Sequence, residues 1–174
     1  GYICDIENSQ YSLIVGENST YRNIHNSILA CASSTFTHET RSAGNMIVGD
    51  HHTITDSENL IVSGSTNVIS TSNYSAVFGS NNKILSGSGY SFVSGSDNRI
   101  ESNSYYSAIL GGISNIINTS SFYSAIVAGM SNILDNRSYY SAILGGISNI
   151  INTSSYYSAI VAGMSNILDN RSYY

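Results

Sequence analysis

The chain has 174 residues, of which only 10% are charged, whereas about 25% are charged in a typical soluble domain. Ser (35 residues), Ile (23), Asn (20) and Tyr (14) predominate, and Pro and Trp are absent. These turn-forming and strand-forming residues argue against helical bundles and doubly wound α/β folds, and the 41% hydrophobic content argues against disorder. The net charge of −5 offers no basic surface for nucleic acid, and the chain lacks the apolar run of about 18 residues that membrane insertion requires.

Internal repeats organise the chain. Residues 105–138 and 139–172 are identical except that Phe122 becomes Tyr156, and each block contains two 17-residue units. Weaker units upstream have lengths of 15, 18, 14, 16, 16 and 16 residues, counted from starts at Ser12, Ser27, Asn45, Asn59, Ser75 and Ser91. Units this short, without helical spacing of apolar residues, predict an all-β parallel β-solenoid of the β-roll type. We expect about ten coils of 14–18 residues with two strands each, in an oligomeric assembly.

Three regions follow one another along the chain. We expect irregular N-terminal coils or a cap over 1–44, a solenoid with 14–16-residue coils over 45–106, and near-identical 17-residue repeats over 107–174. Because the chain begins at a Gly and its last unit ends without a polar cap, we expect a segment of a longer rod or a subunit that polymerises end to end.

Both cysteines and all four histidines lie within the first 52 residues. Cys4 and Cys31 fall in different coils, so we expect their Cα atoms to lie beyond the ~7 Å limit for a disulfide, with Cys31 a small core residue. The histidines lie near acidic residues but lack the His-x-His or His-x3-His spacing that favours a zinc site. We therefore expect no metal and no cofactor. The four histidines are His25, His38, His51 and His52.

The first strand of each unit carries two columns that we expect to point inward. Strand residues alternate between faces, so residues two apart share one face. The aliphatic column contains Ile14, Leu29, Ile47, Ile61, Val77, Val93, Ile109, Ile126, Ile143 and Ile160. The small column, two residues later, contains Gly16, Cys31, Gly49, Ser63, Gly79, Gly95, Gly111, Ala128, Gly145 and Ala162.

A corner Asn precedes the second strand. Asn tolerates the left-handed conformation, and stacked Asn side chains can bond one another, so we expect a ladder of left-handed Asn residues at this corner. Its clearest members are Asn115, Asn132, Asn149 and Asn166. The second wall of the core follows two residues later, at Ile117, Leu134, Ile151 and Leu168.

The first strand carries apolar outward residues from the early units onward, such as Met46 and Val48, and the outward column of the second strand becomes apolar in the last four coils. A single rod in water would place polar residues there, so we expect these residues to form a face between chains. On the first strand this face contains Leu110, Val127, Leu144 and Val161. On the second strand, where earlier coils carry Thr53, Val68, Lys83 and Arg99, it contains Ile116, Ile133, Ile150 and Ile167.

Aromatic residues stack at another corner of each unit. We expect a ladder that includes Tyr106, Tyr123, Tyr140 and Tyr157, doubled by a second column with Tyr105, Phe122, Tyr139 and Tyr156. Structural stacking is the favoured interpretation, and a carbohydrate-binding platform or a contact between chains is the alternative. Sequons for N-glycosylation fall after the second strand at Asn118, Asn136, Asn152 and Asn170.

The unit Ser-Ala-Ile-Leu-Gly-Gly-Ile-Ser-Asn-Ile-Ile at 107–117 resembles the head repeats of trimeric autotransporter adhesins and the repeats of bacteriophage and large-virus fibres. The resemblance covers about residues 45–174. It implies a parallel β-roll whose chains associate through hydrophobic faces, and a location outside the cell, at the cell surface or on a virion. This sequence departs from the adhesin pattern by its bulky Ile residues and its Tyr-Tyr pairs.

No convergent set of acid, base and nucleophile suggests an enzyme. Asp135 and Asp169 recur with the repeat beside Arg137 and Arg171, as solvated corner residues would. We therefore expect a structural protein: a rigid segment of an adhesin, fibre or self-assembling filament, whose partners are copies of itself and a surface receptor or glycan. The alternatives are an engineered repeat protein and an ice-binding or ice-nucleating solenoid, although no Thr-x-Thr rank is expected to recur.

Overall fold

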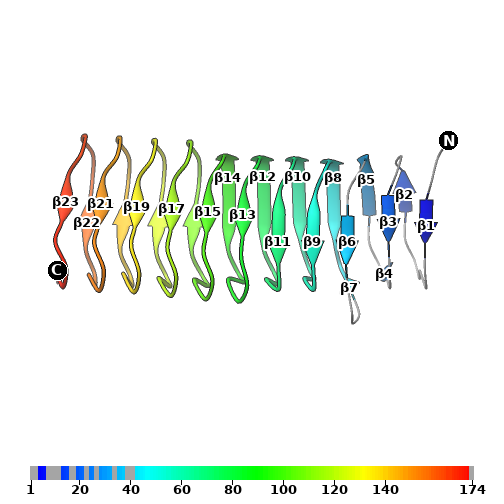
Figure 1. Cartoon of the computed structure of the whole chain (residues 1–174), viewed down its shortest axis with the longest axis horizontal. Coiled ribbons are helices and arrows are strands. Elements are labelled where there is room, and N and C mark those ends of the chain that lie inside the picture. Colours follow the sequence, from blue (N-terminus) through cyan, green and yellow to red (C-terminus); the bar gives the residue numbers. More distant parts are fainter. Residues whose placement is uncertain are drawn as a thin grey trace.

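The computed structural model describes residues 4–6, 13–15, 19–21, 24–25, 28–32, 35–37 and 42–172, with side chains at Ile28, Ala30 and from Gly44 onward. Short parallel strands stack coil upon coil along an elongated rod (Figure 1). The predicted all-β parallel solenoid is thereby confirmed, and the described residues contain no helix.

Two long sheets run the length of the rod, one for each strand of the coil. The first sheet consists of β2 (Leu13–Val15), β5 (Ile28–Ala32), β8 (Met46–Asp50), β10 (Ile61–Ser65), β12 (Ala76–Ser80), β14 (Phe92–Ser96), β16 (Ala108–Ile109), β18 (Ala125–Ile126), β20 (Ala142–Ile143) and β22 (Ala159–Ile160). The second sheet consists of β1 (Cys4–Ile6), β3 (Ser19–Tyr21), β6 (Thr35–Thr37), β9 (Thr53–Thr55), β11 (Val68–Ser70), β13 (Lys83–Ile84), β15 (Arg99–Ile100), β17 (Ile116–Ile117), β19 (Ile133–Leu134), β21 (Ile150–Ile151) and β23 (Ile167–Leu168). A separate pair joins β4 (Ile24–His25) to β7 (Ser42–Ala43).

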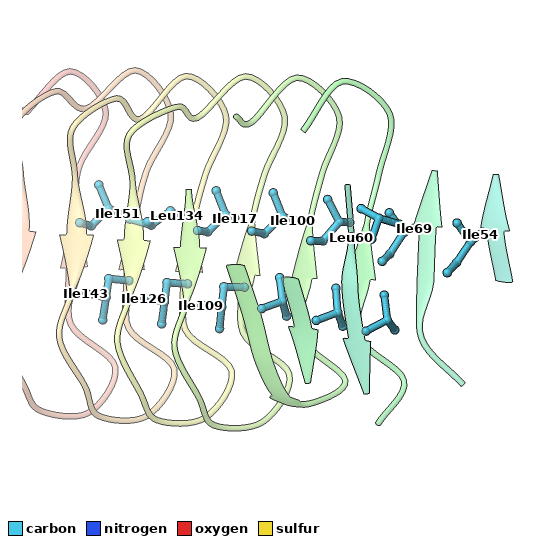
Figure 2. Packing of buried hydrophobic residues seen from close by; sticks show 14 of the residues in the cluster. Ile54, Leu60, Ile69, Ile100, Ile109, Ile117, Ile126, Leu134, Ile143 and Ile151 are labelled. Carbon is cyan, nitrogen blue, oxygen red and sulfur yellow. The ribbon is translucent and has the colours of Figure 1, made fainter. Parts of the chain in front are cut away.

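The core is a double row of aliphatic side chains between the two sheets (Figure 2). One row comes from the first sheet and includes Ile109, Ile126 and Ile143, all fully buried, and Ile160, which is 6% exposed. The facing row comes from the second sheet and includes Ile117, Leu134 and Ile151, fully buried, with Leu168 partly buried against the cluster. Each strand therefore contributes one inward residue per coil.

The inward column of the first sheet differs from the prediction at one coil. Ile61 pairs with Met46 and Ala76, so the residue in line with Ile47 is Val62. Val62 is 1% exposed, whereas Ile61 is 46% exposed and points outward. The boundary predicted at Asn59 was wrong by one residue, and the spacing of paired residues makes these two coils 15 residues long rather than 14 and 16.

The prediction for the inward column of small residues was also wrong in part. The stacked column passes through glycines with positive φ, and a Cβ on Gly112 would lie 2.0 Å from the carbonyl oxygen of Gly129. Only glycine fits so close to the backbone of the next coil. Ser63, Gly111, Ala128, Gly145 and Ala162 lie one residue before this column. The column itself contains Gly49, Gly64, Gly79, Gly95, Gly112, Gly129, Gly146 and Gly163.

The additional residue of each 17-residue coil is inserted just before that glycine. Strand β14 has five residues, but β16 has two, and pairing resumes only as an isolated bridge between Ser96 and Ile113. The insertion interrupts the ladder locally, as a β-bulge does. Ala128 is accordingly exposed, and a Cβ on Gly145 would meet nothing within 4 Å.

Buried polar side chains bond successive coils at three corners. Before each of them stands a residue in the left-handed region, as Ser114 (φ 57°), Ser120 (φ 61°) and Tyr123 (φ 55°) show. The left-handed residue at the first corner is therefore not the Asn, as predicted, but the residue before it. The buried side chains that follow in this coil are Asn115, Ser121 and Ser124.

The Asn ladder satisfies backbone groups that the turn leaves unpaired. Oδ1 of Asn115 accepts the backbone N–H of Asn132 at 3.0 Å, while its Nδ2 donates to the carbonyl of Gly129 at 2.9 Å. The serine ladders repeat this pattern, since Oγ of Ser121 accepts the N–H of Ser138 and donates to the carbonyl of Asp135. Buried polar groups need such partners, so the ladders hold the coils in register.

Candidate functional site

The titratable residues of the C-terminal coils do not converge. The carboxylate of Asp135 accepts hydrogen bonds from Nδ2 of Asn118 and Oγ1 of Thr153, both at 2.9 Å, on the coils before and after it. In the described part of the chain the ion pairs within 4.0 Å are His51 with Asp50 and Arg99 with Glu101. The Asp135 carboxylate is thus one member of a hydrogen-bonded ladder on the surface of the rod.

The surface ladder includes one of the positions at which the two 17-residue units of the 34-residue repeat differ. Positions 118, 135, 152 and 169 alternate Asn, Asp, Asn and Asp. Stacked residues lie about 4.8 Å apart, so identical carboxylates in every coil would repel one another. The alternation doubles their spacing and gives each carboxylate an amide neighbour.

His52 occupies the place of an Asn in the corner ladder. It is 1% exposed, its Nδ1 lies 3.3 Å from the backbone N of Asn67, and its Nε2 lies 3.2 Å from the carbonyl oxygen of Val48. The imidazole must accept at Nδ1 and donate from Nε2 to make both bonds, which requires the neutral ring. Burial lowers the pKa of His52 below its usual value, against the opposing effect of the hydrogen bond to Val48.

Within the described residues, no group of three or more His, Cys, Asp and Glu side chains could hold a metal ion. The side chains of His25, His38, Cys4 and Cys31 lie outside that description. Cys4 belongs to β1 and Cys31 to β5, which are strands of different sheets. Cys31 pairs with Gly49, in line with the glycine column.

The predicted face between chains lies on the surface of the last four coils, where the structure adds a third column. Leu110, Leu144 and Val161 are exposed, and Val127 is half-buried. Ile116, Ile133 and Ile150 are half-buried, and Ile167 is 60% exposed. The bulge turns a further column outward at the corner between them: Ile113, Met130, Ile147 and Met164.

These three columns, which we call the apolar face, have polar counterparts in the preceding coil. The strand register aligns Arg99 with Ile116, and the bridge aligns Ser96 with Ile113. The surface before Ile113 carries Asp97, whose pKa is lowered by hydrogen bonds from Ser96 and Asn81. The apolar face therefore begins abruptly, at the first 17-residue coil.

The aromatic residues form two parallel stacks along the rod. Tyr74, Tyr90, Tyr106, Tyr123, Tyr140 and Tyr157 follow one another with ring centroids 4.8 to 5.1 Å apart. Each has a positive φ, which is uncommon for a bulky residue, and the rings inside the stack are stabilised by stacking on both neighbours. The second stack contains Tyr105, Phe122, Tyr139 and Tyr156.

The four sequon asparagines differ in accessibility. Asn136 and Asn170 are exposed, whereas Asn118 and Asn152 are half-buried. Asn118 also donates to Asp135 within the surface ladder. Modification of any of them stays a prediction.

The prediction that no Thr-x-Thr rank recurs was wrong. Thr35 pairs with Thr53 and Thr37 with Thr55, so a Thr-x-Thr rank recurs in β6 and β9. The rank ends in the next strand, where Val68 and Ser70 take these positions.

Comparison with known proteins identifies no relative. No family model matches the sequence, and neither the curated proteins nor the solved structures contain a match. The described residues include no helix that could span a membrane.

Proposed function

We propose that the chain is a structural protein, a rigid segment of an extracellular or virion fibre, adhesin or filament, whose last four coils pack against a second copy of the same chain. The observation that carries the proposal is the apolar face, with columns beginning at Leu110, Ile113 and Ile116. The resemblance of the repeat to adhesin heads and viral fibres supports a location at a cell or virion surface.

The size of the apolar face matches that of a protein interface. Eight of its side chains are between 42% and 68% exposed. Together they leave on the order of 800 Å² of apolar surface in water, which is what one partner of a standard interface buries. Exposed patches of this size mark interaction sites on soluble proteins.

The repeating geometry of the face favours a copy of the chain as the partner. Each column places one side chain per coil, at the strand spacing of about 4.8 Å. A second copy presents the same columns at the same spacing, so the ridges of one face fit the grooves of the other over all four coils. The three columns of the apolar face also carry no charge of their own that association would have to desolvate.

Sedimentation equilibrium tests this proposal. The sequence indicates which substitution should leave the fold intact. Lys83 and Arg99 occupy the column of Ile133 and Ile150 in earlier coils, so a Lys at this position is compatible with the solenoid. We expect the parent chain to sediment as a multiple of 18.6 kDa, and the double variant Ile133→Lys/Ile150→Lys as a folded monomer.

The matched control is Val68→Lys, in the same column but outside the apolar face. It should associate as the parent does. A parent chain that stays monomeric at all concentrations, or a double variant that associates like the parent, would contradict the proposal.

A further inference from the structure

The second aromatic stack stops at Tyr105, and a hollow lies beyond it. Tyr105 stacks on Phe122 with ring centroids 4.7 Å apart and an interplanar angle of 7°. In the preceding coil the equivalent position is Gly89, because Tyr106 stacks on Tyr90 and its N–H bonds the carbonyl of Gly89. That coil therefore has no equivalent ring to stack on the other face of Tyr105.

The hollow has the size and the walls of a small-ligand site. Its volume is about 370 Å³, and its lining consists of Asn73, Tyr74, Gly87, Gly89, Tyr90, Tyr105 and Tyr106. Ligand pockets usually measure about 300 to 1,000 Å³ and combine aromatic walls with a few polar groups. Tyr105 and Tyr106 meet at 88°, so one ring forms the end of the hollow while the first stack forms its side.

The chemistry of the lining selects the ligand. None of these residues is charged at neutral pH, so a neutral ligand is favoured over a phosphate, a carboxylate or an amine. The uncovered ring needs a flat apolar partner, and the Asn73 amide and the tyrosine hydroxyls offer hydrogen bonds at the rim. A pyranose ring has both features, with C–H groups on one face and hydroxyls around its edge.

We propose that this hollow is a binding site for a neutral pyranoside, which stacks on Tyr105 in the place that the next ring of the ladder would occupy. Tyr105 is the residue that decides affinity, and Tyr90 and Tyr106 position the sugar against it. The site lies ahead of the apolar face, so it is a further function and does not depend on self-association.

The experiment uses the full chain in the monomeric Ile133→Lys/Ile150→Lys background, and also as the parent, so that failure of one proposal leaves the other testable. Methyl β-glucopyranoside, methyl β-galactopyranoside and methyl α-mannopyranoside are each titrated and followed by saturation-transfer NMR. For a ligand of this size we expect a Kd on the order of 1 mM for at least one of them.

Three variants distinguish stacking from nonspecific contact. Tyr105→Ala should weaken binding by about tenfold or more, as the removal of a stacking ring does for nucleobases. Tyr105→Phe keeps the ring face and should bind within about twofold of the parent, as Phe122 shows that the ladder accepts phenylalanine. Tyr157→Ala removes an exposed ring outside the hollow and should leave binding unchanged.

Two results would overturn the inference. One is the absence of a signal from all three pyranosides at about 20 mM, well above the expected Kd. The other is an affinity of Tyr105→Ala equal to that of the parent. Binding of para-cresol in their place would show an aromatic ligand instead. Tyr105 is 37% exposed, so its substitution should not unfold the chain, and an unchanged circular dichroism spectrum controls for this.

Discussion

Removal of one amide from the Asn ladder tests how the coils are held together. Asn132 is fully buried, its Oδ1 accepts the N–H of Asn149 at 3.0 Å, and its Nδ2 donates to the carbonyls of Ala128 and Gly146. In Asn132→Ala the N–H of Asn149 is left without this partner inside the protein. The carbonyl of Gly146 is affected less, because it also accepts the N–H of Met130 at 3.0 Å.

The expected loss of stability follows from these contacts. An orphaned buried N–H costs about 1 to 3 kcal/mol, and each lost hydrogen bond contributes about 1 kcal/mol. We expect Asn132→Ala to lower the free energy of unfolding by about 3 kcal/mol, which corresponds to a decrease of about 6 to 12 °C in Tm for a chain of this length.

Urea unfolding followed by circular dichroism measures the effect. The control is Asn136→Ala, an exposed Asn in the same coil, which should change stability by less than about 0.5 kcal/mol. If the two variants unfold at the same urea concentration with the same slope, the Asn ladder is not what holds these coils in register.

Three further perturbations test the core, the corners and the ladder histidine. Leu134→Ala opens a cavity at a fully buried position and should cost about 2 to 5 kcal/mol in urea unfolding. Ser148 is exposed and has a φ of 55°, so Ser148→Gly should relieve backbone strain. The free energy of unfolding should increase by up to about 1 kcal/mol, and Tm should rise accordingly. The lowered pKa of His52 means that the unfolded chain binds more protons, so stability should fall as pH drops below the ordinary histidine pKa of about 6.5. His52→Asn, which keeps the bond to Asn67, should remove this dependence from pH-resolved melting curves.

The repeat and most core residues could be predicted because their residue types are informative. Aliphatic residues recur at one position per strand, and the fully buried Ile109 and Ile117 illustrate both rows. The register near Asn59 could not be predicted in the same way, because Ile61 and Val62 are both aliphatic and either could point inward. Alignment of Gly64 with Gly79 carries that information, since a Cβ on Gly64 would lie 1.9 Å from the carbonyl oxygen of Gly79.

The polar ladders and the third apolar column were harder to predict. Serine is so frequent that its type does not signal burial, although Ser121 and Ser124 are buried in every equivalent coil from Ser72 and Ser75 to Ser155 and Ser158. Constancy of Ser at these two repeat positions was the available signal. The column of Ile113 depends on where the bulge falls, and that position becomes clear only when Gly112 rather than Gly111 is aligned with Gly95.

Oxidative footprinting of the three methionines tests self-association through the apolar face most directly. Met130 and Met164 belong to the face and are 45% and 68% exposed, while Met46 lies outside it and is also 45% exposed. Oxidation by hydrogen peroxide, quantified by mass spectrometry across a range of protein concentrations, reports the accessibility of each. We predict that Met130 and Met164 become protected as concentration rises while Met46 does not, and that Ile133→Lys/Ile150→Lys abolishes the protection. Equal rates for Met46 and Met130 at every concentration would contradict the account.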